Sequence, residues 1–370
     1  MAILLALAAT TAQAQTEGEP AELQIVASPF LVFEWAEELS ADAALSDLDN
    51  DGDLDIVVAN GRHWPQFNGV YLNSGNGRML EMVPLGITAT PSYQIIPADL
   101  NRDGQIDLVV INDGLPARVH LAQQDGGFGA GHAIAGTGGN ARGAAIADLD
   151  GDGLLDLAIA RRGEADLLAL GLGDGGFAAP VPLSGDGTRS IRINAADIDA
   201  DGDTDLLISR RDGQPSVIAR NDGAGRFTEL PLPAELGASR ALIAADLTGD
   251  GRLALVSCSL DGSNVILQIG DAGTAVIARF GEPGDGCYSI GAADFDSDGR
   301  MDFVVGNSEH PNYLYRQRSD LSFERIIVEE EPNDTYGLTI GDVNGDGTPD
   351  VVFANSEAFN AVYLVRKRSE

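Results

Sequence analysis

Short runs of apolar and β-branched residues alternate with acidic, glycine-containing segments along most of the chain. Residues 191–193 form such a run before an acidic segment, and residues 56–58 form one after another acidic segment. No stretch shows the 3.6-residue period of an amphipathic helix. The pattern predicts an all-β chain of short strands joined by turns.

One nine-residue acidic segment recurs seven times. The seven copies begin at Asp47, Asp99, Asp148, Asp197, Asp246, Asp294 and Asp342, with spacings of 52, 49, 49, 49, 48 and 48 residues. Most repeats contain a third apolar run, such as residues 119–121, and several continue through a glycine-rich turn to a fourth strand expected to start at Phe128, Phe177 or Phe227. Four antiparallel strands in such a period are typical of a propeller blade. Seven repeats predict a seven-bladed β-propeller of four-stranded antiparallel blades.

The last repeat contains three strand-like runs, one before and two after its acidic segment, so its fourth strand must come from elsewhere. Residues 31–35, or the earlier residues 23–26, precede the first repeat and have no other assignment. Pairing them with the last blade would remove an exposed sheet edge. We therefore expect an N-terminal strand to close the ring, and one propeller to span residues 23–370.

The acidic segments have the pattern D-x-D-x-D-G-x-x-D, which places side-chain oxygens at loop positions one, three, five and nine. The backbone carbonyl of position seven is expected to face the same centre. Calcium takes 6 to 8 oxygen ligands in flexible geometry, so it fits this donor set better than magnesium. The predicted ligand positions are Asp47, Asp49, Asp51, Asp53 and Asp55; Asp99, Asn101, Asp103, Gln105 and Asp107; Asp148, Asp150, Asp152, Leu154 and Asp156; Asp197, Asp199, Asp201, Asp203 and Asp205; Asp294, Asp296, Asp298, Arg300 and Asp302; and Asp342, Asn344, Asp346, Thr348 and Asp350.

These loops resemble the start of an EF-hand, which requires a glutamate at position twelve. That position holds strand-forming residues such as Val58 and Phe353, so the EF-hand interpretation fails and position nine is the expected bidentate ligand. The fifth loop has Thr248 at position three and Ala254 at position nine, which predicts weak or absent binding there and about six calcium sites elsewhere. The competing interpretation is that the loops are ordinary polar turns rich in Asp and Gly.

The repeats resemble the FG-GAP or VCBS repeats of the integrin α-subunit propeller and of exported bacterial proteins, over residues 23–370. This resemblance implies that each acidic loop joins the first two strands of a blade and binds calcium. It also implies a seven-bladed propeller.

Residues 1–14 form an apolar run that ends in small residues, which predicts a cleaved signal peptide, and residues 15–22 form a short linker. The protein is therefore expected to be secreted or periplasmic. No stretch reaches the ~20 apolar residues of a membrane span. The 57 acidic and 23 basic residues give a net charge of -34, which argues against nucleic acid and anionic membranes as partners. We expect a monomer.

The face opposite the acidic loops is expected to carry arginines suited to carboxylate or sulfate groups. They either bind such groups or pair with neighbouring acids such as Glu164 and Asp212. The short segment of Arg62, His63 and Trp64 is either a sugar- or peptide-binding element or a packed loop. The predicted arginines on this face are Arg142, Arg161, Arg162, Arg189, Arg210, Arg211 and Arg240.

The sequence favours a binding or adhesion module for an extracellular protein or acidic polysaccharide. The alternative is an enzyme similar to propeller polysaccharide lyases, with His63, Tyr93, Tyr288 and Tyr336 as candidates for proton transfer; no spacing singles them out. No metal motif of histidines, nucleophile elbow or phosphate loop appears. Cys258 and Cys287 are expected at the same end of neighbouring blades, either as a disulfide or as two buried thiols.

Overall fold

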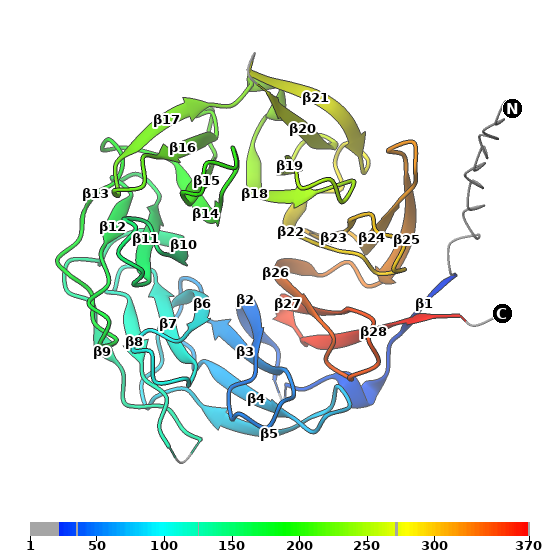
Figure 1. Ribbon diagram of the computed structural model, residues 1–370. Coiled ribbons are helices and arrows are strands. Elements are labelled where there is room, and N and C mark those ends of the chain that lie inside the picture. Colours follow the sequence, from blue (N-terminus) through cyan, green and yellow to red (C-terminus); the bar gives the residue numbers. More distant parts are fainter. Residues whose placement is uncertain (1–21, 35, 125, 271–272, 369–370) are drawn as a thin grey trace, which may run out of the picture.

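The strands are arranged in a ring around a central axis (Figure 1). The computed structural model describes residues 22–34, 36–124, 126–270 and 273–368. The innermost strands of the ring are β2, β6, β10, β14, β18, β22 and β26. Apart from two 3-10 helices, η1 (Pro29–Leu31) and η2 (Ala234–Leu236), the regular elements of the described residues are strands. The prediction of an all-β propeller is confirmed.

Five separate four-stranded antiparallel sheets hold the second to sixth repeats, each with its strands in chain order from the axis outward. The second and third repeats form β6 (Ser92–Ala98), β7 (Asp107–Asn112), β8 (Arg118–His120), β9 (His132–Ala133), β10 (Ala141–Ala147), β11 (Asp156–Arg161), β12 (Leu167–Ala169) and β13 (Val181–Pro182). The fourth and fifth form β14 (Ser190–Ala196), β15 (Asp205–Arg210), β16 (Val217–Asn221), β17 (Phe227–Pro231), β18 (Ser239–Asp246), β19 (Leu253–Ser259), β20 (Asn264–Gly270) and β21 (Gly273–Phe280). The sixth forms β22 (Cys287–Ala293), β23 (Asp302–Asn307), β24 (Asn312–Gln317) and β25 (Phe323–Glu329).

The first and seventh repeats share one eight-stranded sheet. Its strands are β1 (Leu23–Val26), β2 (Glu38–Ser46), β3 (Asp55–Asn60), β4 (Gly69–Asn73), β5 (Met79–Pro84), β26 (Asp334–Gly341), β27 (Asp350–Ala358) and β28 (Ala361–Lys367). The expectation of seven separate blades is therefore wrong: the structure has five blades and this larger curled sheet. The reason is local, because β2 and β27 are nine residues long and pair through Glu38 with Ala358 and Leu39 with Ser356.

An N-terminal strand completes the sheet of the last repeat, as the sequence predicts. Strand β1 runs antiparallel to β28, and Leu23 lies opposite Lys367. The choice between the two candidate segments is resolved in favour of residues 23–26. Of the later segment, Val32 makes a single bridge with Ala361, and Trp35 lies outside the described residues.

The outermost strands differ from the prediction in two repeats. Phe227 begins β17, as expected. Phe128 and Phe177 form only isolated bridges, and the outer strands of these repeats are the later two-residue β9 and β13. Glycines and prolines such as Gly129 and Pro180 interrupt the chain between these phenylalanines and the strands.

The hydrophobic core lies between neighbouring sets of strands. The described residues form seven buried clusters, and each combines residues of two adjacent repeats. The cluster of Ile56, Tyr71, Val352 and Val362 joins the two halves of the eight-stranded sheet. Packing between adjacent repeats therefore continues around the whole ring.

The segment after β1 contacts both halves of the eight-stranded sheet and stabilises the junction between them. Phe33 packs edge-on against Tyr71 with ring centroids 4.9 Å apart. The buried Glu34 accepts hydrogen bonds from the Asn360 backbone N–H at 3.3 Å and from the Tyr71 hydroxyl at 3.5 Å. Burial raises the pKa of Glu34 to about 7, although both hydrogen bonds favour its charged form. The junction thus contains a carboxylate that is costly to ionise.

A disulfide joins Cys258 of β19 to Cys287 of β22 and so ties the fifth repeat to the sixth. The sequence left open whether these cysteines form a disulfide or remain two buried thiols, and the structure shows the disulfide. The expected signal peptide, residues 1–14, and nearly all of the linker 15–22 lie outside the described residues. Within the described part of the chain, no helix has the length and apolar character to cross a membrane.

We predict that Glu34→Gln removes part of the pH dependence of stability. The folded protein keeps a proton on Glu34 between pH 4.5 and about 7, whereas the unfolded chain has released it, so the free energy of unfolding falls as the pH rises through this window. Relative to the variant, the natural protein should lose on the order of 2 to 3 kcal/mol between pH 5 and 8. Urea denaturation at both pH values, at constant calcium, measures this difference. The matched control is the exposed Glu37→Gln, which should keep the natural pH slope; equal slopes in all three proteins would contradict the prediction.

Candidate functional site

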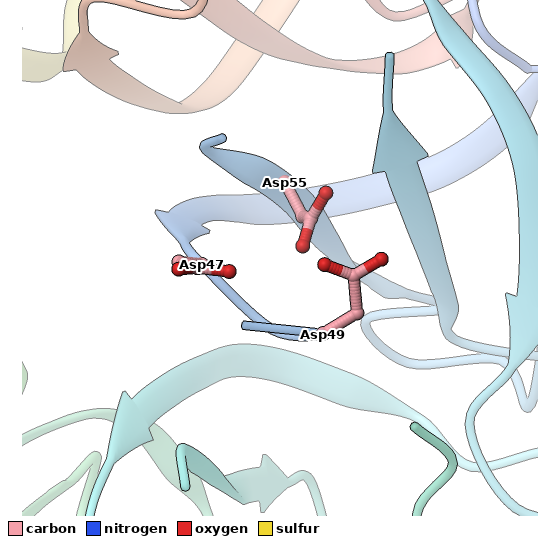
Figure 2. A group of neighbouring side chains, drawn as sticks. All are labelled: Asp47, Asp49 and Asp55. Carbon is pink, nitrogen blue, oxygen red and sulfur yellow. The ribbon is translucent and has the colours of Figure 1, made fainter. Parts of the chain in front are cut away.

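The acidic loops connect each innermost strand to the second strand of its repeat, as in the step from β2 to β3. Figure 2 shows Asp47, Asp49 and Asp55 of the first loop with their carboxylates turned toward one region. Asp47 and Asp49 are partly buried, and Asp55 is fully buried. The loop therefore presents carboxylates from positions one, three and nine around one centre.

The loop shape depends on the aspartate at position one and the glycine at position six. In the first loop the Gly52 N–H donates to Asp47 Oδ2 at 3.1 Å, and Gly52 has a φ of 96°. A Cβ on Gly52 would meet no atom within 4 Å, so the positive φ, not crowding, explains the glycine. The same hydrogen bond occurs in the other six loops, from Gly104, Gly153, Gly202, Gly251, Gly299 and Gly347.

Position nine holds the loop to the rest of its repeat. Asp55 accepts from the Leu48 N–H at 2.8 Å and, with its other oxygen, from the Asn73 N–H of β4 at 2.8 Å. The same pair of hydrogen bonds recurs at Asp107, Asp156, Asp205, Asp302 and Asp350. The sequence suggested only a metal ligand here, because the third-strand donor lies about 15 residues further along the chain and no motif marks it.

The arrangement fits a divalent cation. In four loops one carboxylate oxygen from each of positions one, three and nine lies within 4.8 Å of the others. Asp47 Oδ1 and Asp296 Oδ2 are buried and have no hydrogen-bond partner in the structure, so they are oriented as ligands would be. The triads are Asp47, Asp49 and Asp55; Asp148, Asp150 and Asp156; Asp197, Asp199 and Asp205; and Asp294, Asp296 and Asp302. Carboxylate oxygens are ligands for hard cations.

The remaining loops differ in charge. Asn101 and Asn344 replace the position-three aspartate in the second and seventh loops, and their amide groups donate to Asp103 and Asp350. The fifth loop keeps the position-one hydrogen bond from Gly251 but has Ala254 in place of the position-nine carboxylate. These loops therefore offer fewer anionic oxygens than the four triads.

Arginines reduce the negative charge of two further loops. Arg220 of β16 pairs with Asp199 at 3.1 Å, and Arg316 of β24 lies 3.9 Å from Asp296. In the first, second, third and seventh repeats the corresponding position holds a leucine, such as Leu72 or Leu121, and in the fifth it holds Gln268. The sequence reasoning missed this difference, although the position lies 22 to 25 residues after the first aspartate of each loop.

Crowding and burial oppose ionisation in these loops. Burial, with the nearby charges of Asp49 and Asp51, raises the pKa of Asp55 to about 6. Burial and neighbouring loop carboxylates raise the pKa of Asp302 and of Asp350 to about 7. A cation would favour the ionised forms, so metal binding at these loops would be coupled to folding.

A second feature lies at the opposite end of the innermost strands. Each of these seven strands has a register shift near its start, which leaves one residue out of the ladder. All seven bulged residues line one cavity of about 230 Å³, which we call the axial cavity. They are Ala41, Tyr93, Arg142, Ile191, Arg240, Tyr288 and Tyr336, each six residues before the first aspartate of its loop. At about 3.3 Å per residue, the cavity and the loops are separated by about 20 Å.

Bulges are known to redirect side chains at functional sites, and here they turn one side chain per repeat toward the axis. The other four lining residues are His63, Arg162, Arg192 and Arg211. The eleven lining residues thus include five arginines and no carboxylate. On a protein of net charge -34, this is a local concentration of positive charge.

Some of these arginines already have carboxylate partners. Arg142 pairs with Asp113 at 2.7 Å, and Arg162 pairs with Asp212 at 2.7 Å. Arg192 reaches from the fourth repeat to Asp42 of β2 at 3.0 Å. Burial raises the pKa of Asp42 to about 6, while the charge of Arg192 lowers it.

Arg240 instead packs on aromatic rings. Its guanidinium lies 4.1 Å from the ring centroid of Tyr288 and 5.2 Å from that of Tyr336. Arg62 lies 4.1 Å from the centroid of Tyr336. Burial, together with the like charges of Arg211 and Arg192, lowers the pKa of Arg240 to about 10. Arg240 thus remains cationic at neutral pH in a strongly positive environment.

A hydrogen-bonded chain of three side chains lies at the same cavity. The Tyr93 hydroxyl is 2.9 Å from His63 Nε2, and His63 Nδ1 is 2.7 Å from Asp113 Oδ2. Burial raises the pKa of Tyr93, so its hydroxyl keeps the proton and donates to His63. In the tautomer with the proton on Nδ1, His63 donates to Asp113 and accepts from the Tyr93 hydroxyl. The four residues that sequence reasoning named for proton transfer, His63, Tyr93, Tyr288 and Tyr336, all line the cavity.

The structure divides the predicted ligand-face residues into groups. Arg161 pairs with Glu164, and Arg210 pairs with Glu229; neither lines the cavity. Arg189 lies near Asp212 at 3.5 Å, outside the lining. Trp64 is 70% exposed, so it is not a packed side chain. The sequence reasoning did not name Ala41, Ile191 or Arg192; the constant six-residue offset was the signal that would have found the first two.

Comparisons with known proteins agree with this architecture. Six overlapping segments match the family model described as FG-GAP-like repeat: residues 47–110, 99–159, 148–208, 197–257, 246–305 and 294–353. Curated proteins include no match. A crystal structure of BBS1N in complex with ARL6DN, soaked with lead, has a TM-score of 0.60 and 12% identity over 90% of this chain and 95% of that one. A mercury-soaked crystal of the same complex gives the same values over 95% and 98%. The matched segments cover most of the sequence, and the chain belongs to the family of FG-GAP-like repeat proteins.

Proposed function

We propose that the protein is an exported, calcium-stabilised propeller that acts as a binding module for an extracellular protein or acidic polysaccharide. The observation that carries this proposal is that the two ends of each innermost strand lead to different features. One end continues into an acidic loop, and the other end contributes a residue to the axial cavity. The BBS1N structures, which are complexes with a second protein, support a role in binding. Export rests on the apolar residues 1–14.

Calcium is the proposed cation. The donors are carboxylates, amide oxygens and backbone carbonyls, and the loops provide more oxygens than the few that magnesium takes from proteins. The first and third loops combine a full triad with carboxylates that pair with no arginine among the described contacts, although Arg102 donates to the Gly153 carbonyl of the third loop; they are the strongest proposed sites. We assign weaker sites to the fourth and sixth loops, because Arg220 and Arg316 supply part of the positive charge.

The eight-stranded sheet is proposed to act as two propeller units. Strands β2 to β5 belong to the first repeat, and β26 to β28 with β1 belong to the seventh. The two sets pack through their own hydrophobic cluster, as neighbouring blades do. With the five separate blades they provide the seven bulged residues of the axial cavity.

We predict that removing calcium destabilises the fold. Each site would add about 2.7 kcal/mol at a free calcium concentration of 100 times its dissociation constant. A chelator should therefore lower the melting temperature by many degrees, and calorimetric titration should give about six calcium ions by the sequence count of complete loops. An unchanged melting curve would refute a structural role for the cation.

Two matched variants separate metal binding from turn formation. Asp51→Asn and Asp250→Asn alter the same loop position, and both aspartates accept from the position-seven N–H, at 2.9 and 3.1 Å. Asp51→Asn should weaken one calcium site, whereas Asp250→Asn should leave the titration unchanged, because the fifth loop lacks the position-nine carboxylate. Equal effects of the two variants would count against calcium in the first loop.

We also predict saturable binding to extracellular material without turnover. The calcium-loaded protein, immobilised, should retain an acidic polysaccharide or a protein from cell-surface extracts, and the retained amount should fall with salt because the proposed surface is cationic. Neutral polysaccharides passed over the same surface are the control. If the immobilised protein retains neither acidic polysaccharides nor proteins, the proposal of a binding module is rejected.

A second candidate function is a lyase that acts on acidic polysaccharides. The chain of Tyr93, His63 and Asp113 beside several arginines favours it, since a carboxylate held by arginines makes the neighbouring C–H more acidic and a histidine-linked tyrosine can transfer a proton. In such an elimination the proton leaves the carbon next to the carboxylate, its electron pair forms a carbon–carbon double bond, and the glycosidic C–O bond breaks. The leaving oxygen takes up a proton.

The lyase candidate makes its own prediction. Incubation with polyuronates should produce unsaturated uronates, measured by ultraviolet absorbance, and Tyr93→Phe or His63→Gln should reduce the rate at least 100-fold, within the range attributed to general acid–base catalysis. Arg226→Gln, at an exposed position paired with Asp222, is the control and should keep the rate. Absence of unsaturated product with the natural protein would exclude this function.

A further inference from the structure

We propose that the axial cavity is an anion-binding site that holds the carboxylate of one acidic sugar residue, with Arg240 and Arg211 as its charge partners. This inference rests on the proposed binding function and specifies its ligand and its site. It is carried by the geometry of the cavity, the ion pairs around it and the polar character of its lining.

The first step is the excess of positive charge. Seven arginines lie in or beside the cavity, and their ion-pair partners are only three carboxylates, since Arg162 and Arg189 share Asp212. Among the described residues, no carboxylate lies within ion-pair distance of the other three. The seven arginines are Arg62, Arg142, Arg162, Arg189, Arg192, Arg211 and Arg240.

The second step is that two of the three arginines without carboxylate partners, Arg240 and Arg62, are held in place by aromatic rings. Tyr288 and Tyr336 contact the Arg240 guanidinium through their ring faces, and the two rings contact each other at 4.8 Å. Arg62 covers Tyr336, and the Arg62 Nε is buried without a hydrogen-bond partner in the structure. A preorganised guanidinium loses little conformational freedom when it binds a carboxylate through two N–H groups. The site is therefore arranged before its ligand arrives.

The third step is that a bound carboxylate would resemble the aspartate partners that three neighbouring arginines already have. Arg142, Arg162 and Arg192 each have an aspartate carboxylate at 2.7 to 3.0 Å. An incoming carboxylate would give Arg240 and Arg211 the partner that their three neighbours have. Burying these like charges without one is unfavourable, as the lowered pKa of Arg240 reflects.

The fourth step is that the size and polarity of the cavity favour a sugar over a protein segment. The volume of about 230 Å³ is below that of usual drug-sized pockets, so a single ring or side chain enters. Three tyrosines and His63 offer polar atoms for hydroxyl groups, whereas Ala41 and Ile191 are the only apolar residues of the lining.

The test is a binding measurement with defined probes. Isothermal titration of the calcium-loaded full chain with trigalacturonate should show saturable binding that weakens as salt increases. Arg240→Gln and Arg211→Gln should each weaken it by roughly 10- to 100-fold, the loss expected for a hydrogen bond to a charged group. Arg226→Gln removes the same charge from an exposed position near the acidic loops and should keep the natural affinity.

Further probes distinguish the chemistry. A neutral galactose trimer and a triaspartate peptide should bind at least tenfold more weakly than trigalacturonate, and a sulfated galactose trimer should also bind more weakly than trigalacturonate. Equal or tighter binding of any of these would overturn the assignment to a sugar carboxylate. Because Arg240→Gln alters a packed aromatic cluster, its melting temperature is measured first, and Arg240→Lys, which keeps the charge but not the two-pronged geometry, should retain an intermediate affinity.

The inference and the proposed function fail separately. If both arginine variants are folded and keep the natural affinity for trigalacturonate, the axial cavity is not the site, while capture of extracellular polymers would still support a binding module. If the natural protein does not bind trigalacturonate, the inference is rejected, and the extract screen alone decides the proposed function.

Discussion

The structure depends most on one interaction, the pair of backbone N–H groups that donate to each buried position-nine carboxylate. At Asp55 one donor belongs to the loop and the other to the third strand, so a single side chain fixes the hairpin, the loop and the neighbouring strand together. Buried carboxylates are costly unless they are paired and hydrogen-bonded. Two N–H donors meet part of that cost, and six repeats use the same solution.

The remaining free-energy cost of burying these ionised carboxylates would be lowered by a bound cation. Burial and neighbouring carboxylates raise the pKa of Asp302 and of Asp350 to about 7, so positive charge placed nearby would favour their ionised forms. Arg220 and Arg316 supply such charge within two repeats. The fifth repeat lacks the buried carboxylate altogether, and it is the one joined to its neighbour by the Cys258–Cys287 disulfide. The repeats therefore share a fold but differ in what stabilises it.

The other end of each innermost strand is free of this constraint, and there the repeats diverge. The bulged position holds alanine, isoleucine, arginine or tyrosine, according to the repeat. Because the ring brings all seven positions to one cavity, small differences between repeats combine into a site that no repeat contains alone. The cavity also concentrates positive charge on a protein whose net charge is -34.

The sequence by itself determined the repeat, the order of strands within it and the acidic loops, because these depend on short-range patterns: a period near 49 residues, alternating strand runs and a glycine such as Gly52 with positive φ. It also limited the closing strand to residues 31–35 or 23–26, and the structure decided for residues 23–26. Only the tertiary structure decided the pairing of β2 with β27, the disulfide, the position-nine hydrogen bonds to the third strand and the contact of Arg192 with Asp42, 150 residues away. Each of these joins groups that are distant in the chain, and their distance in space is set by how the sheets twist and pack around the axis, which no local pattern records.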